Sequence, residues 1–223
     1  GAKPWLVREP VRDYHVVGRA ELVDRVWRKL RDGVDTSLLF LPGVGKTTVA
    51  QELLRERDKI LGHFDGVLWA NLGRQHVDSA ELRAWGEALG IPAERMNSFD
   101  DKELWLRALQ DAIGDRCMLV VLDDVWRTED ARRFMELGPR CVFLSTTRSK
   151  TVAKELGAGM LVPELDPPQA FGLLCEVAPG AVEADPMAAK ALLGTLQGLP
   201  LAIVLVGKVL RRAASEAHAD PAR

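Results

Sequence analysis

Short apolar runs alternate with amphipathic stretches over the first two-thirds of this chain. The apolar runs are rich in Val, Leu and Phe and end near Gly, Pro or charged residues, as strands buried in a parallel sheet do. Apolar residues recur at helical spacing between the runs, which predicts helices on both faces and hence an α/β fold with a doubly wound parallel sheet. The five expected strands are 37–41, 66–72, 118–122, 141–145 and 160–162, and the expected helices are 20–31, 47–57, 79–89, 100–113, 128–136 and 150–156.

The pattern changes after residue 162, where prolines interrupt the chain and only helical periodicity follows. This part is too small to hide a core of its own, so we expect a small all-α unit that docks on the sheet unit. Its expected helices are 169–177, 186–196 and 201–212. The predicted organisation is an N-terminal segment 1–14, a sheet domain 15–162, a helical domain 163–212 and a C-terminal tail 213–223.

Composition narrows the class of protein. The 223 residues carry a formal net charge of −2, so the chain as a whole has no general attraction for nucleic acid or for an anionic membrane. The longest apolar runs, 118–122 and 199–206, are too short to cross a bilayer. The three cysteines are an odd number and lie in apolar patterns, which indicates reduced thiols. These features predict a cytoplasmic protein.

The loop after the first expected strand carries the strongest functional signal. The strand runs into Gly43-Val44-Gly45-Lys46-Thr47-Thr48, and a helix is expected to follow. In such a loop the backbone N–H groups converge on phosphate oxygens, and the next helix adds the positive end of its dipole. Lys46 would neutralise the β and γ phosphates, and Thr47 would place a hydroxyl on Mg²⁺. The segment therefore predicts the nucleotide site of a P-loop NTPase.

One position departs from the phosphate-loop pattern. The spacing G-x-x-x-x-G-K-[ST] calls for a glycine where this sequence has Phe40. Phenylalanine resists the positive φ that glycine adopts freely, at a cost of roughly 1–2 kcal/mol. Two explanations stay open at this point: a loop of a different shape, or a loop that lacks one residue.

A pair of carboxylates follows the third expected strand. Residues 118–122 lead directly into Asp123 and Asp124. In a doubly wound sheet the ligand crevice lies beyond this end of the strands. One carboxylate can hold Mg²⁺ through its water shell, and the other can orient or deprotonate the attacking water. A simple turn before a helix is the alternative.

The fourth expected strand also ends in polar residues. Residues 141–145 lead into Thr146, Thr147 and Arg148. Where a strand lies between the two nucleotide motifs of a P-loop protein, its tip sits beside the γ-phosphate, so any of these three side chains could sense that phosphate. A solvated Arg148 at a helix start is the alternative.

Six short motifs occur in a fixed order along nearly the whole chain. They are Val16-Val17-Gly18-Arg19, Val44-Gly45-Lys46-Thr47-Thr48, Phe64-Asp65-Gly66-Val67-Leu68-Trp69, Leu122-Asp123-Asp124-Val125-Trp126, Ser145-Thr146-Thr147-Arg148 and Gly198-Leu199-Pro200-Leu201-Ala202. Several are weak alone, but all of them in this order are specific. With them the chain resembles the NB-ARC nucleotide-binding modules of apoptosome scaffolds, plant disease-resistance proteins and bacterial STAND proteins, the signal-transduction ATPases with numerous domains.

The resemblance implies a role for each matching position. Val17 and Arg19 would flank the adenine of ATP or ADP, and Pro200 would close over the base from the helical unit, with Leu201 beside it. Arg148 would be the phosphate sensor. The implied catalytic residues are Asp124, Lys46 and Arg148, the Mg²⁺ ligands are Thr47 and, through water, Asp123, and the phosphate cradle is Gly43 to Thr48. Trp69 and Trp126 are better explained as packing residues.

We therefore expect an ATP/ADP-binding switch module that hydrolyses ATP slowly and forms homo-oligomers on activation within a longer parent protein. That parent would add a winged helix, an effector domain and sensor repeats, and this segment itself would contact neither membrane nor nucleic acid. One rival is an AAA+-like ATP-driven motor, which needs an arginine from a neighbouring subunit. Another is a nucleotide-gated transcription regulator. The motif at 198–202 favours the switch over the motor and does not separate it from the regulator.

Overall fold

The computed structural model describes residues 3–6, 19–40, 48–73, 79–98 and 101–219. A sheet of five parallel strands forms its centre, in the order β2-β3-β4-β1-β5. The expected parallel sheet is confirmed, and each strand lies close to its predicted place. The strands are β1 (Thr36–Phe40), β2 (Gly66–Asn71), β3 (Met118–Val125), β4 (Val142–Thr147) and β5 (Ala158–Val162).

Apolar side chains alternate between the two faces of the sheet. Val67, Leu119 and Val121 belong to one buried cluster, whereas Leu68 and Val120 belong to the other. Since both faces are buried, the strands read as nearly continuous apolar runs. The first cluster is covered by α1 (Ala20–Arg31), α2 (Thr48–Leu54) and α3 (Arg57–His63), and the second by α4 (Ser79–Ala88), α5 (Ala93–Asn97), α6 (Lys102–Ile113), α7 (Thr128–Met135) and α8 (Lys150–Leu156).

Two differences from the expected helices have local causes. The helix expected at 47–57 ends at Leu54 as α2, and Glu56 leaves the helical conformation with φ −82° and ψ 59° before α3, which was not predicted. Neither glycine nor proline marks that break, so the apolar periodicity alone predicts a helix that continues through it. The short helix α5 was not predicted, since its five residues are too few to show a helical period.

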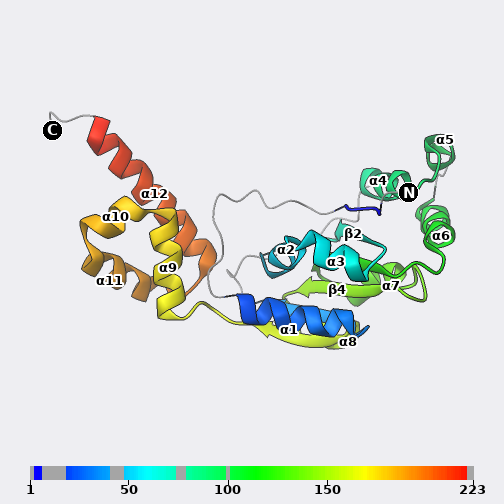
Figure 1. Ribbon diagram of the computed structural model, residues 1–223, viewed down its shortest axis with the longest axis horizontal. Helices are drawn as coiled ribbons and strands as arrows, with labels where there is room; N and C mark the ends of the chain where they lie inside the picture. The colour runs from blue at the N-terminus through cyan, green and yellow to red at the C-terminus, as the bar shows by residue number, and fades with distance from the viewer. Residues whose placement is uncertain (1–2, 7–18, 41–47, 74–78, 99–100, 220–223) are drawn as a thin grey trace.

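Helices α9 (Pro167–Val177), α10 (Pro179–Ala184), α11 (Pro186–Leu196) and α12 (Pro200–Ala219) follow the sheet and form a separate group beside it (Figure 1). All four begin with proline, and the side chains of Asp166 and Asp185 cap α9 and α11 by accepting hydrogen bonds from backbone N–H groups. These helices enclose an apolar cluster of their own. Helix α12 continues to Ala219, beyond residue 212 where the last helix was expected to end.

A close backbone contact joins the exit from the sheet to the start of α12. The N–H of Leu165 donates to the carbonyl of Gly198 at 2.9 Å. Gly198 has a φ of +66°, and a Cβ there would collide with the carbonyl of Leu165. The next residue, Leu199, packs against the cluster beneath α1, α2 and α3. The start of α12 is therefore held against the sheet unit.

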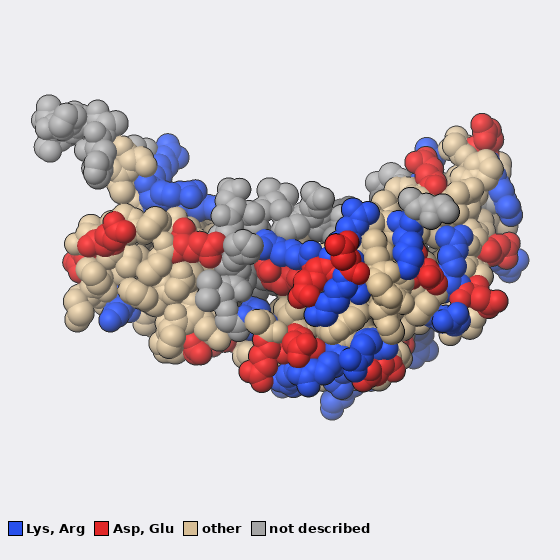
Figure 2. Space-filling model, in the orientation of Figure 1, with Lys and Arg blue, Asp and Glu red and all other residues tan. Residues whose placement is uncertain are grey.

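The face of the molecule in Figure 2 carries charges of both signs over the sheet unit. Exposed ion pairs of the sheet unit include Arg28 with Asp24 at 2.6 Å and Lys59 with Glu56 at 3.0 Å. Within the described ranges, no helix is both long and apolar enough to span a membrane.

Candidate nucleotide site

The sheet order brings the expected chemical motifs to one edge. Strand β4 lies between β1 and β3, and all three are parallel, so their carboxyl ends meet on the same side of the sheet. The expected phosphate loop follows β1, the carboxylate pair ends β3, and Arg148 follows β4. The candidate residues Val17, Gly43, Val44, Gly45, Lys46 and Thr47 lie outside the described residues, as does the side chain of Thr48.

The backbone at Phe40 shows whether this residue must adopt the positive φ that the loop pattern assigns to its first glycine. Phe40 is the last residue of β1 and pairs with Val162 of β5. A strand residue has an extended backbone, so the left-handed conformation that a phenylalanine resists is not needed here. The strand occupies the position at which the loop pattern places its first glycine.

The two carboxylates at the end of β3 have different environments. The side chain of Asp123 is buried, with 2% of the residue exposed, whereas Asp124 is half-buried. Asp124 also has a φ of +57°, in the left-handed region that aspartate and asparagine tolerate better than most residues. One carboxylate is thus held inside the sheet edge and the other is turned toward its surface.

Hydroxyl groups at the end of β4 are engaged inside the protein. Ser145 donates to the hydroxyl of Ser37 at 2.7 Å, which joins β4 to β1. Thr147 donates to the carbonyl of Val125 at 2.7 Å and accepts from the N–H of Ser149 at 3.1 Å. Of the candidate phosphate sensors, Thr147 is therefore occupied by the backbone.

Arg148 lies at the surface with its guanidinium over an aromatic ring. The guanidinium carbon is 5.7 Å from the ring centroid of Trp126, a distance typical of a cation–π contact. These residues, with Asp124 and Ser149, line a hollow of about 230 Å³. Trp126 was expected to be a packing residue, and here it packs against the candidate sensor.

Arg19 lies buried where α1 begins. Only 4% of the residue is exposed, and its Nη2 has no hydrogen-bond partner within the described part of the chain. Burial lowers the pKa of this guanidinium. A buried arginine nitrogen without an acceptor is costly, so this position fits a ligand that supplies one.

Pro200 and Leu201 are the first two residues of α12. Pro200 is buried, whereas Leu201 is 47% exposed. Leu199 and Val23 both pack against the apolar cluster beneath α1, α2 and α3. The start of α12 and helix α1 therefore both lie against the sheet unit.

Sequence reasoning missed Asn71, the last residue of β2. Asn71 lies opposite Asp123 in the β2–β3 pairing, and its Oδ1 is buried without a partner among the described residues. The sequence contained a signal for this residue, because it is a polar side chain at the carboxyl end of a buried strand. In such a sheet that end is where ligands bind.

The donor chemistry of this edge fits Mg²⁺ bound with a nucleotide. Among the described residues, no group of three or more His, Cys, Asp or Glu could hold a metal by itself. Mg²⁺ does not require one, because it is usually bound through one or two carboxylates, substrate phosphates and water. Asp123 supplies such a carboxylate at the end of β3.

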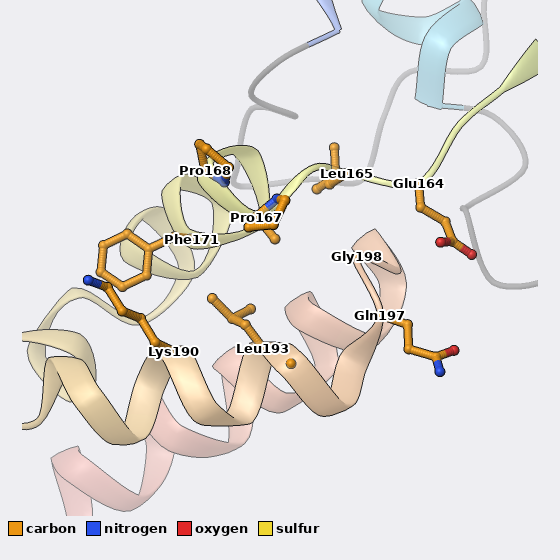
Figure 3. A pocket seen from close by; sticks show the side chains of 11 residues that line it. Glu164, Leu165, Pro167, Pro168, Phe171, Lys190, Leu193, Gln197 and Gly198 are labelled. Atoms are coloured by element: carbon orange, nitrogen blue, oxygen red, sulfur yellow. The ribbon is translucent and has the colours of Figure 1, made fainter.

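A larger groove lies within the helical unit and is separate from these strand ends. Its volume is about 920 Å³, and all of its lining residues come from α9, α11 and the segments before and after them. Figure 3 shows Phe171 and Lys190 at one end and Gln197 at the other. The Lys190 nitrogen is 5.5 Å from the Phe171 ring centroid. None of the candidate nucleotide-binding residues lines this groove.

The NB-ARC domain family matches residues 19–182, and the chain belongs to this family. Curated relatives include two disease-resistance proteins of Arabidopsis thaliana. RFL1 is 27% identical over 209 residues, which cover 87% of this chain and 23% of the relative. The RPP13-like protein 4 is 28% identical over 231 residues, which cover 94% of this chain and 26% of the relative. The chain thus spans about a quarter of these proteins.

A solved structure supports the fold. The STAND protein with a tetratricopeptide repeat sensor from Pyrococcus horikoshii aligns with a TM-score of 0.55 and 17% identity, over 87% of this chain and 30% of that one. Together with the family match, this likeness makes the chain an NB-ARC nucleotide-binding module with the P-loop NTPase fold of STAND proteins.

Proposed function

We propose that this chain is an ATP/ADP-binding switch that hydrolyses ATP slowly. The observation that carries the proposal is the sheet order, because β4 between β1 and β3 gathers the phosphate-loop sequence, the carboxylate pair and Arg148 at one edge. A nucleotide held there has its phosphates near all three. Arg19 and the start of α12 are available for its base.

Each residue at this edge has a distinct role in the proposal. Lys46 and the loop from Gly43 to Thr48 bind the phosphates. Asp123 and Thr47 hold Mg²⁺, which would neutralise negative charge on the β and γ phosphates. Asp124, the more accessible carboxylate, orients the attacking water and accepts its proton. Arg148 binds the γ-phosphate when it is present and rests over Trp126 when it is not.

The helical unit would serve as a lid. Residues 163–212 form the proposed lid domain, and 15–162 the nucleotide-binding domain. The lid encloses its own apolar cluster and meets the sheet unit at Leu199, so it has the internal order to move as a unit about that junction. Adenine would bind between Arg19 and Val17 on one side and Pro200 and Leu201 on the other. The γ-phosphate would then bias two arrangements of lid and sheet.

The whole protein would use this switch in signalling. Since the relatives are disease-resistance proteins and the neighbour is a STAND protein with a sensor domain, we propose a cytoplasmic signalling protein that assembles into homo-oligomers when activated. The surface charges of both signs and the net charge of −2 give no reason to propose direct nucleic-acid binding by this segment. An AAA+-like motor remains the rival that turnover can exclude.

Slow turnover that depends on Asp124 is the expected result. The turnover number of the unsubstituted chain for ATP hydrolysis should be far below the roughly 1–100 s⁻¹ that is typical of kinases. Asp124→Asn should reduce it about a hundredfold further while ATP still binds, because asparagine tolerates the φ of +57° but cannot accept the proton. Phosphate release at saturating ATP measures the rate, and Asp101→Asn, a capping residue of α6, is the control.

Two results would contradict this account of hydrolysis. Equal turnover in Asp124→Asn and the parent would make the carboxylate structural. Turnover of many per second without a partner would favour the motor.

A further inference from the structure

A single hydroxyl on β4 contacts both carboxylate residues of β3. Thr146 Oγ1 donates to Asp123 Oδ1 at 2.6 Å and accepts from the N–H of Asp124 at 2.9 Å. Thr146 is buried, with 1% of the residue exposed. A hydroxyl that donates to a carboxylate at this distance makes a strong, charge-assisted hydrogen bond.

The backbone explains why the hydroxyl is needed at this point. The β3–β4 pairing joins Leu122 to Ser145 and then Val125 to Thr147, so Asp123 and Asp124 together face Thr146 alone. This is a β-bulge, which leaves one residue without its regular ladder bond and turns its side chain in a new direction. Thr146 Oγ1 supplies the missing acceptor for the N–H of Asp124, which has the positive φ.

The other hydroxyls of β4 bind elsewhere. Ser145 bonds to Ser37, and Thr147 bonds to the backbone of Val125 and Ser149. The hydroxyl of Thr146, by contrast, bonds to the two residues proposed to act on Mg²⁺ and water. Its one proton is given to Asp123, so the hydroxyl is committed to the carboxylate and is not a donor toward phosphate.

We propose that Thr146 is the positioning residue of this site. Its hydroxyl fixes the plane of the Asp123 carboxylate, and thereby the direction of the second oxygen, and holds the bulge that turns Asp124 outward. Because Arg148 directly follows β4, two residues after Thr146, a movement of Arg148 on phosphate binding would reach both carboxylates through Thr146. The inference rests on the proposed function, in which Asp123 binds Mg²⁺ and Asp124 orients the attacking water.

The test compares Thr146→Val, which keeps the shape and loses the hydroxyl, with Thr146→Ser, which keeps the hydroxyl. In Thr146→Val we expect turnover to fall ten- to hundredfold and the gain in ATP affinity on adding Mg²⁺ to shrink at least fivefold. Affinity for ADP in EDTA should stay within about twofold, because the phosphate loop is unchanged. Thr146→Ser should restore both properties to within about threefold of the parent.

A second measurement needs no nucleotide. Amide exchange of Asp124, followed by NMR in the nucleotide-free protein, should be at least tenfold faster in Thr146→Val and near the parent rate in Thr146→Ser. Ser145→Ala is the control, since it removes a buried hydroxyl from the same strand without touching either aspartate. It should leave the exchange of Asp124 and the Mg²⁺ response unchanged. If Thr146→Val does not fold, Thr146→Cys, with its weak donor, takes its place.

The outcomes separate the two proposals. Parent-like Mg²⁺ response, turnover and Asp124 exchange in Thr146→Val would overturn the positioning role and leave the proposed function standing. Faster Asp124 exchange in Thr146→Val, together with an unsubstituted chain that binds no Mg-nucleotide, would overturn the proposed function and, with it, any role of Thr146 in the reaction.

Discussion

Lys46→Ala should weaken ATP and ADP binding roughly a hundredfold or more, a loss of about 3 kcal/mol at 1.4 kcal/mol per tenfold. The lysine charge is proposed to bind the β and γ phosphates, and Coulomb attraction at contact distance in a partly closed site is of this order. Titration with a fluorescent nucleotide measures the affinity. The melting temperature without nucleotide should match that of the parent, because Lys46 belongs to a loop with no expected core role.

The matched control for this prediction is Lys154→Ala. Lys154 is an exposed lysine in the last turn of α8, so its loss changes the net charge equally without touching the strand ends. It should leave the affinity within about twofold. Unchanged affinity in Lys46→Ala would contradict the phosphate-loop assignment.

Gly198→Ala should destabilise the junction between sheet and lid by about 2–5 kcal/mol, the sum of a backbone clash and a positive-φ penalty. The added Cβ would collide with the carbonyl of Leu165, whose N–H bonds to Gly198. Since Pro200 follows within two residues, displacement of this turn should also weaken ADP binding. Thermal unfolding and ADP titration measure the two effects, and hydrogen exchange should locate them at the start of α12.

Gly194→Ala provides the comparison for Gly198→Ala. Gly194 lies inside α11, and a Cβ there meets no neighbour. Alanine is favoured over glycine in a helix interior by roughly 1 kcal/mol, so this variant should be as stable as the parent or more stable. Equal ADP affinity and stability in Gly198→Ala and Gly194→Ala would contradict the role of the junction in closing the site.

Much of the sheet was predictable because each strand is buried on both faces and reads as an apolar run. Met118 begins β3 as expected, and Asp123 and Asp124 lie at the carboxyl end of that strand, where the sequence predicted them. The fourth expected strand is present as β4, and it lies between β1 and β3 in the sheet.

The details that shape the site were not predictable, because they depend on contacts between strands. The bulge opposite Thr146 arises from the β3–β4 register, which no local pattern reports. The contact of Arg148 with Trp126 likewise joins residues from two strand ends. The spacing of the phosphate-loop pattern, which calls for glycine at Phe40, suggested strain there, yet pairing with Val162 makes Phe40 an ordinary strand residue. Motif spacing predicts which residues belong to the site, whereas the pairing of the strands determines how their side chains are oriented.

The proposed switch requires an adenine nucleotide bound at the carboxyl edge of the sheet. The most direct measurement is to denature the purified protein, identify the released nucleotide by chromatography and mass spectrometry, and titrate the emptied protein with ADP and GDP. We expect ADP to be released at close to one per chain, and the emptied protein to bind ADP at least tenfold more tightly than GDP. A protein that releases no nucleotide and binds neither would contradict the account.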